Sequence, residues 1–316
     1  MTSEKVVSAR EAIERFLPEG SALVAVGGMH LHDNPMALIR EMVRQGRHVR
    51  RLVTSPCGAM SADVLLGAGL VAEILTSYVG FEHLGLAPCF RRAAESCSVR
   101  ILEADEAYLT HGLYAGAGGL PFVPLPRGLE LADVAKVNPE SYRRVIDPFT
   151  SEEVLAGAPL APEVALIHAR EADEKGNAGI AGAHFLDRVM ALAARTVVVQ
   201  VERVVPTERI ATYAVGTTIP GFLIDAVVVA PGGCHPTASH GEYRMDEEGL
   251  REYLGLARDQ DGFDSWADEQ VRSRSEVEYA AATAARLEGL RYEEANLPPS
   301  TAGSRPGSPS RGGEGR

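Results

Sequence analysis

Short apolar runs alternate with amphipathic segments along the first third of the chain. The uninterrupted runs predict strands that are covered on both faces, whereas apolar residues three or four apart predict helices. The predicted strands are 22–26, 51–54, 70–77 and 99–102, and the predicted helices are 8–16, 36–46, 61–66 and 88–96. This steady alternation indicates an α/β fold with an open, mostly parallel sheet flanked by helices.

Local signals mark the ends of several predicted helices. Ser8 has a Glu three residues later, which is the spacing of a capping box. Pro35 suits the first turn of a helix, with Asp33 or Asn34 as its N-terminal cap. Gly46 suits the C-terminal cap of the same helix. These signals support the helix boundaries that the apolar pattern predicts.

Three acids, Glu103, Asp105 and Glu106, directly follow the fourth predicted strand. A helical pattern comes next, and the glycine-rich run 115–119 ends it. A helix N-terminus favours negative charge, and open α/β sheets bind ligands beyond the carboxyl ends of their strands. The acids therefore allow two interpretations: an N-terminal capping cluster, or an active site into which Glu106 points.

A stretch rich in Pro and Gly, residues 126–162, separates this block from a second one. It is interpreted as an irregular connection or a flap over the site. Beyond it, strands are predicted at 164–168, 196–201, 210–213 and 222–230, and helices at 185–194, 246–258 and 265–290. Asp225 falls inside an apolar run and is expected to be a buried acid with a partner. We interpret residues 1–292 as one domain and residues 293–316 as a disordered tail.

Composition narrows the class of protein. Of the 316 residues, 45% are hydrophobic, which is ample for a core, and the net charge is -12 at pH 7. An acidic chain without a Lys/Arg cluster argues against a nucleic-acid partner. The four cysteines lack CxxC spacing, the N-terminus has no apolar signal core, and no run has the length of a membrane span. We therefore expect reduced thiols, a cytoplasmic protein and no membrane partner.

Several catalytic signatures are missing from the places where they would be needed: GxGxxG, the P-loop and the nucleophile elbow GxSxG. His30 and His32 lie beside Asp33, and two His with an Asp could bind a metal. No further ligand follows at a spacing typical of metal sites, so we predict no metal site. His235, in the loop GGCHPT, suits either a ligand contact or a hydrogen bond within a turn. The sequence does not choose between these two roles.

Gly27 and Gly28 end the predicted strand 22–26. A double glycine after a strand lets the backbone approach a ligand closely and leaves N–H groups free. The pair alone is a weak signal, because many turns contain two glycines.

Four runs carry a resemblance to a known family. They are EGSALVAVGGMHLHDNPMALIREMVRQG, DVLLGAGLVAEILTSYVGFEHLGLAPCFRRA, AGAGGLPFVPLP, and VALIHAREADEKGNAGIAG with VVVQVERVV and APGGCHPT after it. On these runs, within residues 10–287, the chain resembles the A (α) subunit of family I CoA-transferases, and that of glutaconate CoA-transferase most of all. Met29 stands where the family usually has Phe, and Glu19 where it usually has Asp.

The resemblance implies a Rossmann-like fold and a homologous B (β) subunit in an α2β2 heterotetramer. Members move CoA between an acyl-CoA thioester and a carboxylic or dicarboxylic acid. The nucleophilic glutamate attacks the thioester and becomes a glutamyl-CoA thioester. It belongs to the B (β) subunit, in a Ser-Glu-Asn-Gly-like motif that this chain lacks. No permanently bound cofactor is implied, because CoA enters as part of the substrate.

The resemblance also assigns roles to residues. It makes Glu106 the catalytic residue of this chain. The positions that it places against substrate or CoA are Gly27, Gly28, Met29, Asn34, Ser77, Gly80, Gly118 and Gly119. No metal ligand is implied.

Glu106 leaves the type of reaction open. In transferase chains this place can hold a polar residue on the oxyanion side. The Asp-Glu pair is also similar to CoA-thioester hydrolases that open rings in steroid breakdown, in which the acid of the α chain is a base. We prefer the transferase and keep the hydrolase as the alternative. A third, non-enzymatic alternative is a structural subunit that completes an interface, with Glu106 as a solvent-facing helix cap.

Overall fold

The computed structural model describes residues 5–211 and 218–292. The strands of its main sheet are β1 (Val6–Val7), β2 (Val24–Val26), β3 (Val49–Thr54), β5 (Val71–Thr76), β7 (Arg100–Glu103), β11 (Val164–Ala172), β12 (Ala178–Gly179), β13 (Thr196–Val204), β14 (Thr218–Ile219) and β15 (Ala226–Val229). The helices are α1 (Ala9–Phe16), α2 (Met36–Gln45), α3 (Met60–Gly67), α4 (Pro88–Glu95), α5 (Glu106–Ala117), α6 (Val134–Val137), α7 (Asp187–Ala193), α8 (Thr207–Ala211), α9 (Glu247–Leu256), α10 (Gln260–Ala267) and α11 (Glu276–Leu290).

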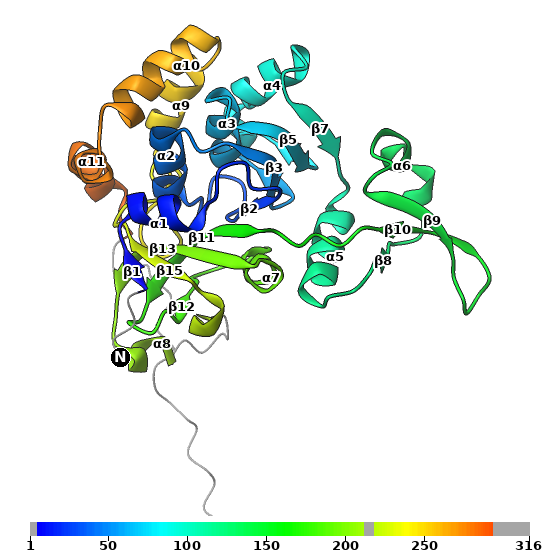
Figure 1. Cartoon of the computed structure of the whole chain (residues 1–316). Helices are drawn as coiled ribbons and strands as arrows, with labels where there is room; N and C mark the ends of the chain where they lie inside the picture. Colours follow the sequence, from blue (N-terminus) through cyan, green and yellow to red (C-terminus); the bar gives the residue numbers. More distant parts are fainter. Residues whose placement is uncertain (1–4, 212–217, 293–316) are drawn as a thin grey trace, which may run out of the picture.

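The sheet has the order β1-β15-β13-β11-β2-β3-β5-β7, with β12 attached to β11 and β14 to β12 (Figure 1). Every neighbouring pair in that order is parallel, and only the short β12 and β14 pair antiparallel. The predicted open, mostly parallel sheet flanked by helices is confirmed. The strand β1, which the sequence pattern did not reveal, forms one end of this order.

Each face of the sheet has its own core, because successive residues of a strand point to opposite sides. Val24 and Val26 of β2 belong to the core that α1, α2, α3, α4, α9 and α10 complete. Ala25, between them, belongs to the core that α5 and α7 complete. Since both faces are covered, most residues of the central strands are buried, which explains the apolar runs of the sequence.

The predicted helix caps are confirmed at two of three ends. Ser8 accepts the Glu11 N–H at 3.1 Å and so caps α1. Gly46 ends α2 in the left-handed conformation, with φ +60°. The prediction of an Asp33 or Asn34 cap for α2 is wrong, because Pro35 itself occupies that position without a side-chain hydrogen bond.

The stretch at 126–162, predicted as an irregular connection or a flap, is only partly irregular. It contains α6, β9 (Tyr142–Ile146) and β10 (Glu153–Gly157), and the two strands form an antiparallel sheet with β8 (Val123–Pro124) in the order β8-β10-β9. This arm, residues 120–160, projects from the main sheet in green (Figure 1). Its strands are short and mostly exposed on one face, so their alternation is too brief to stand out between prolines.

The apolar run 222–230 is not one buried strand. Gly221–Leu223 form a 3₁₀ turn, and β15 begins only at Ala226. Asp225, expected to be buried, is exposed, and its Oδ2 accepts the Val197 N–H at 2.8 Å. The Pro-Gly turn that precedes the run bends the chain before the strand can start.

The predicted helix 265–290 is two helices. A π-helical turn (Asp268–Arg272) follows α10, and α11 starts at a capping box between Ser275 and Glu278. Ile210 and Ala211 lie in α8 rather than in a strand, and residues 212–213 of that predicted strand and the expected tail 293–316 fall outside the described residues. Within residues 5–211 and 218–292, we find no helix with the length and apolar character needed to cross a membrane.

Candidate active site

Parallel strands end at one edge of the sheet, so the segments that follow them gather there. Gly27 and Gly28 follow β2, Cys57 follows β3, Ser77 follows β5, and Glu106 follows β7. This carboxyl edge therefore brings together most of the residues that the sequence predicts for the site.

Gly27 and Gly28 form the turn after β2. A Cβ on Gly27 would lie 2.5 Å from Asp187 Oδ1, and Gly28 has φ +79° with the Asp33 carbonyl 2.6 Å from its own Cβ position. Both positions therefore require glycine. The expectation of free N–H groups is wrong, because Gly27 donates to Leu166 O and Gly28 to Asp187 Oδ1, both at 2.9 Å.

The loop after this turn folds back on itself. Met29 and His32 exchange backbone hydrogen bonds of 3.0 and 3.1 Å. Asn34, which was expected to face substrate, is buried, and its amide donates to the His30 and His32 carbonyls at 2.9 and 3.0 Å. Asn34 therefore holds the loop, whereas Met29 is half-buried at its start.

Asp105 and Glu106 have different roles at the start of α5. Asp105 is the N-terminal cap, because its Oδ1 accepts the Ala107 N–H at 2.7 Å. Glu106 is exposed, and within the described part of the chain it has no hydrogen bond or ion pair. The capping interpretation thus holds for Asp105 and leaves the Glu106 carboxylate available. Glu106 faces solvent at the helix start, as expected of a purely structural subunit, but Asp105 rather than Glu106 makes the cap.

Cys57 and Glu82 share the neighbourhood of Glu106. Burial raises the pKa of the Cys57 thiol, and the carboxylates of Glu106 and Glu82 raise it further. The charges of both acids therefore act on this thiol. Glu82 also forms an ion pair with His30, whose N–H donates to the Cys57 carbonyl at 2.9 Å. The cysteine is therefore a neutral thiol beside two acids.

Ser77 and Gly80 support the same edge from β6 (Tyr78–Val79). The Ser77 hydroxyl donates to the Pro56 carbonyl at 2.5 Å, and the Gly80 N–H donates to Gly58 O at 3.1 Å. These bonds tie β6 to β4 (Cys57–Gly58), the strand that carries Cys57. The Ser77 hydroxyl and the Gly80 N–H are therefore used inside the chain.

Gly118 and Gly119 lie away from this group. They end α5, and Glu106 begins it. A helix of 12 residues is about 18 Å long, so the two glycines stand that far from Glu106 along the helix axis. Both glycines are exposed. One bound group cannot touch Glu106 and these glycines together unless it is as long as the helix.

Left-handed backbone conformations mark the same region. Of the six non-glycine residues with left-handed φ in the described part of the chain, Cys97 and Ser151 lie elsewhere, and the other four are His30, Asp33, Glu82 and Phe185, with φ values of +52°, +54°, +55° and +41°. The first three belong to the carboxyl edge, and Phe185 stands two residues before Asp187, the acceptor of the Gly28 N–H. Such conformations cost energy in non-glycine residues and collect at functional sites. The structure thus points to this edge independently of the sequence pattern.

Sequence reasoning did not single out Cys57, Glu82 or Asp187 for the site. Asp187 is 159 residues away in sequence from Gly28, to which it is hydrogen-bonded. The one available signal was the predicted helix 185–194 with an acid in its first turn. Glu82 and Cys57 lie in segments that the sequence pattern predicted only as loops after strands, so nothing marked them as site residues.

The profile of the family described as "Coenzyme A transferase" matches residues 6–230. The chain belongs to this family. The A (α) chain of 3-oxoadipate CoA-transferase from Pseudomonas knackmussii is 34% identical over 85% of this chain and 94% of the relative. The cholesterol ring-cleaving hydrolase IpdA subunit of Rhodococcus jostii is 32% identical over 82% of this chain and 89% of the relative.

A solved structure of the family has the same fold. The crystal structure of glutaconate coenzyme A-transferase from Acidaminococcus fermentans matches with a TM-score of 0.85 at 28% identity, covering 92% of this chain and 97% of that chain. The resemblance to coenzyme A transferases that the four sequence runs indicate is therefore confirmed.

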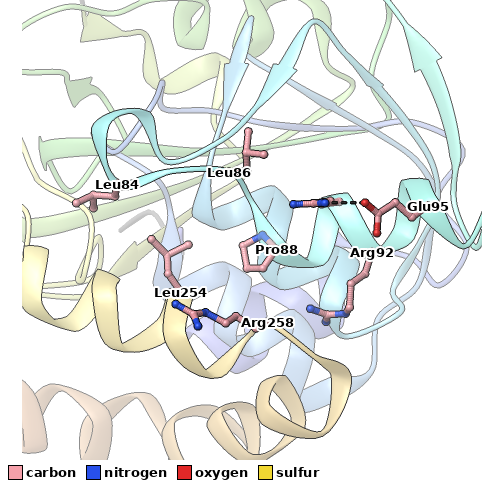
Figure 2. Close-up of a pocket in the computed structure, with 8 residues that line it drawn as sticks. Leu84, Leu86, Pro88, Arg92, Glu95, Leu254 and Arg258 are labelled. Atoms are coloured by element: carbon pink, nitrogen blue, oxygen red, sulfur yellow. Dashed lines mark hydrogen bonds and ion pairs between the residues drawn. The ribbon is translucent and has the colours of Figure 1, made fainter.

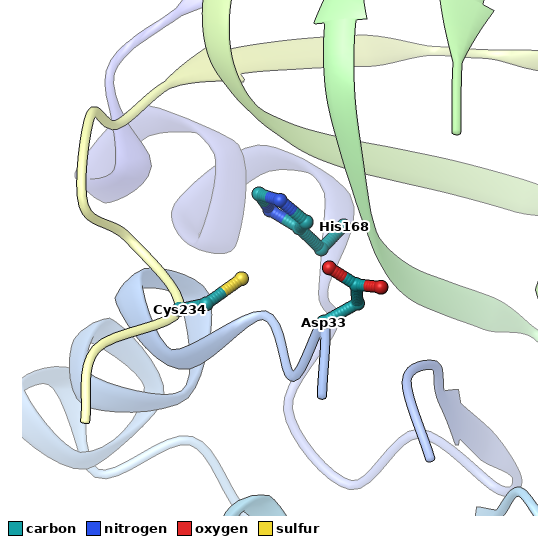
Figure 3. Close-up of side chains that lie close together, drawn as sticks. All are labelled: Asp33, His168 and Cys234. Atoms are coloured by element: carbon teal, nitrogen blue, oxygen red, sulfur yellow. The ribbon is translucent and has the colours of Figure 1, made fainter. Parts of the chain in front are cut away.

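Three buried polar side chains from different segments form a cluster in this coenzyme A transferase family member. Asp33, His168 and Cys234 approach within 4.8 Å of one another (Figure 3). Gln200 Nε2 donates to His168 Nδ1 at 3.1 Å, and His168 Nε2 donates to Ser239 Oγ at 3.0 Å. Burial lowers the pKa of His168 to about 4 and raises that of the Cys234 thiol. Both ring nitrogens are occupied and the thiol is neutral, so the cluster fits a hydrogen-bonded core better than a metal site.

His235, whose role the sequence left open, makes hydrogen bonds within the fold. Its ring lies 2.8 Å from Tyr279 Oη and 2.9 Å from an Asp246 carboxylate oxygen. The imidazole thus joins the loop after β15 to α9 and α11. Its two ring nitrogens leave no position for a ligand.

A cavity of about 460 Å³ lies between α4 and α9 (Figure 2). Its lining combines apolar side chains, three arginines and one acid: Leu84, Leu86, Pro88, Arg91, Arg92, Glu95, Leu254 and Arg258. None of these belongs to the group around Glu106 and the glycine turn. The cavity is therefore separate from the candidate active site.

Proposed function

We propose that this chain is the α chain of a two-chain enzyme that moves CoA between an acyl-CoA thioester and a carboxylic acid. The support is its similarity, over nearly the whole relative, to the α chain of a 3-oxoadipate CoA-transferase. The solved structure that it matches at a TM-score of 0.85 is a glutaconate coenzyme A-transferase. Both names denote dicarboxylic acids, so we propose a dicarboxylic acid as the acceptor.

Glu106 is the observation that carries the assignment of the site. It is an exposed carboxylate without a partner among the described residues, at the helix N-terminus that follows β7. In this proposal the nucleophilic glutamate of the β chain attacks the thioester, which gives an acyl-glutamyl anhydride and CoA thiolate. The thiolate then attacks the glutamyl carbonyl, so the acyl group leaves as its free acid and a glutamyl-CoA thioester remains, from which the acceptor acid takes CoA by the same steps in reverse. Glu106 lines the site from the side of the α chain and orients the bound substrate by accepting a hydrogen bond from one of its N–H or O–H groups.

The second candidate is a CoA-thioester hydrolase. The 32% identical relative from Rhodococcus jostii is named a cholesterol ring-cleaving hydrolase subunit. The free Glu106 carboxylate favours this candidate too, because a general base needs an unpaired carboxylate within reach of water. In this case water replaces the acceptor acid, and Glu106 removes its proton.

A homologous B (β) subunit, in an α2β2 heterotetramer, and a cytoplasmic location are part of the proposal. The arm and its neighbouring segments expose large apolar side chains: Leu120, Phe122, Leu131, Val137, Ile146 and Phe149. The exposed fraction of Phe149 is 95%. Such a collection favours contact with another protein chain over permanent contact with water.

The test is to co-express this chain with a neighbouring β-type chain, as wild type and as Glu106→Gln. Each complex is assayed with an acyl-CoA, with and without an acceptor acid. A transferase releases product only with the acceptor, and Glu106→Gln slows it by roughly 10- to 100-fold without abolishing it. A hydrolase releases CoA without an acceptor and loses all activity with Glu106→Gln.

Glu103→Gln is the matched control, since Glu103 is an exposed acid at the end of β7 in the same segment. It is expected to keep the wild-type rate. Full activity of Glu106→Gln would contradict the assigned site. Activity of this chain without any partner would contradict both candidate functions.

A further inference from the structure

Asp187 lies directly against the glycine turn. It is the first residue of α7, its side chain is 1% exposed, and its Oδ1 accepts the Gly28 N–H at 2.9 Å. A Cβ on Gly27 would approach the same oxygen to 2.5 Å. The carboxyl group therefore forms the floor of the turn, and any change in its size or hydrogen bonding would move both glycines.

The second oxygen of Asp187 has no partner. Oδ2 is buried and makes no hydrogen bond among the described residues. A buried oxygen without a partner costs free energy, and the cost is much larger for a charged carboxylate than for a neutral acid. The Gly28 N–H donates to Oδ1, so the proton of a neutral acid would sit on Oδ2.

Among the described residues, no cation acts on the pKa of Asp187. The titratable or charged side chains to consider are Asp33 and those of its own segment and of the packed elements α5 and β11, namely Glu106, Tyr108, His111, Tyr114, His168, Arg170, Glu171, His184 and Arg188. Of these, Asp33 alone acts on the pKa of Asp187, and it is itself an acid. Burial is the larger cause, and together they raise the pKa of Asp187 to about 8, against the lowering effect of the Gly28 N–H.

We propose that Asp187 is the positioning residue of the candidate active site: it remains an uncharged carboxylic acid and holds Gly27 and Gly28 in the geometry that accepts the thioester. The proposal rests on the proposed function, because it assumes that the thioester binds at this turn. An uncharged Asp187 suits the reaction, because negative charge develops on the thioester oxygen when a nucleophile attacks the thioester carbon. Ionisation of Asp187 would place a second negative charge beneath that oxygen.

The activity test uses the co-expressed complex with Asp187→Asn and Asp187→Ala. Asn keeps an oxygen for the Gly28 N–H and cannot ionise, so it is expected to retain kcat within about threefold near pH 7. Wild type is expected to lose activity as the pH rises through about 8, and Asp187→Asn is expected to lack this loss. Asp187→Ala removes the acceptor and is expected to lower kcat by roughly 10- to 100-fold, with a smaller change in KM.

Asp225→Asn is the matched control, because Asp225 also accepts a backbone N–H, from Val197, but at the opposite edge of the sheet. It is expected to show the wild-type pH profile. The proposal is overturned if Asp187→Asn keeps the alkaline loss, or if it is as slow as Asp187→Ala while both melt at the wild-type temperature.

A second readout does not depend on activity. The infrared difference spectrum between the wild-type and Asp187→Asn complexes at pH 7 should contain the C=O band of a protonated carboxyl, and this band should vanish above about pH 9. A carboxylate band at pH 7 would overturn the proposal even in an inactive complex. A protonated band in a complex without transferase or hydrolase activity would contradict the proposed function and leave the neutral Asp187 standing.

Discussion

Asp187 and Asp225 make the same kind of hydrogen bond at opposite edges of the sheet. Each accepts a backbone N–H, from Gly28 and Val197 respectively. Water reaches Asp225, whereas Asp187 is buried and its pKa is raised to about 8. One side chain is therefore solvated, and the other makes the stability of the fold depend on pH.

The free energy of unfolding should carry this dependence. An unfolded Asp titrates near pH 4, so the folded chain holds one more proton than the unfolded chain between about pH 4 and about pH 8. Stability therefore falls as the pH rises through this window and levels off above it. Asp187→Asn removes the loss, and its advantage over wild type should grow to the order of 3–5 kcal/mol by about pH 9. Urea unfolding at several pH values measures it.

Asp225→Asn is the control for this trend and is expected to follow wild type at every pH. A constant difference between Asp187→Asn and wild type across the window would show that Asp187 is already ionised in the folded chain.

At the scale of residues, the sequence predicted the roles that depend on a residue's position relative to its neighbours along the chain. Glu106 could be found because it follows a strand and begins a helix, and Asp105 because acids cap helices. Asp187 could not be placed, because its contact with Gly28 exists only once β11 and β2 pair. The prediction of free N–H groups at the glycine turn was wrong for the same reason, because their acceptors are distant in sequence.

At the scale of elements, α5 connects the active-site edge to the arm. Its Gly116 lies against the backbone of residue 160, and a Cβ there would come within 1.9 Å of the Leu160 carbonyl oxygen. Gly112, one turn earlier, accepts the Leu160 N–H at 2.8 Å through its own carbonyl. The helix and the chain returning from the arm therefore touch through glycine, with no room for a side chain.

Gly116→Ala should destabilise the protein even though alanine favours helices. The clash is with backbone, which cannot rotate away, so a loss of about 2–3 kcal/mol is expected. Gly255→Ala is the control, since Gly255 lies in α9 with open space around its Cβ position, and it should gain about 0.5–1 kcal/mol. Urea unfolding of both variants gives the comparison. Equal stability of the two would mean that α5 is not packed against the returning chain.

Elements were predicted well where both faces of a strand are covered. The runs that became β2, β3, β5 and β13 are buried at most positions and contain short apolar stretches, so their type was clear. The arm and the run 222–230 failed, because short strands with one exposed face and a turn inside an apolar run give no periodic signal. The break at 268–275 was missed, since amphipathic spacing continues on both sides of it.

At the scale of the whole molecule, the last helices are part of the main core. The family profile ends at residue 230, yet α9 and α10 contribute Leu250, Tyr253 and Phe263 to the core of α2 and α3. Tyr253 donates to the buried Asp63 carboxylate at 2.6 Å. The segment after residue 230 therefore completes one face of the sheet.

Arg40 anchors α11 to the same face. This buried residue of α2 pairs with Glu276, donates to the His235 carbonyl at 2.8 Å, and lies 3.7 Å from the ring centre of Tyr279. Glu276→Gln would leave the guanidinium buried without its carboxylate, and such losses cost about 3–5 kcal/mol. We therefore expect a single unfolding transition in urea with a clearly lower midpoint. The double variant Arg40→Met with Glu276→Gln should recover much of this loss, because it also removes the buried charge.

Glu95→Gln is the matched control, since Glu95 pairs with Arg91 at 2.8 Å on the surface and such pairs contribute about 1 kcal/mol or less. If α11 were an independent addition, Glu276→Gln would speed amide hydrogen exchange in α11 alone and leave the unfolding midpoint unchanged. A fall in the midpoint together with faster exchange in α2 would instead mean that α11 and the sheet fold as one unit. The carboxyl edge would then depend on residues far outside the family profile, since the Arg40 helix begins directly after the loop that Asn34 holds.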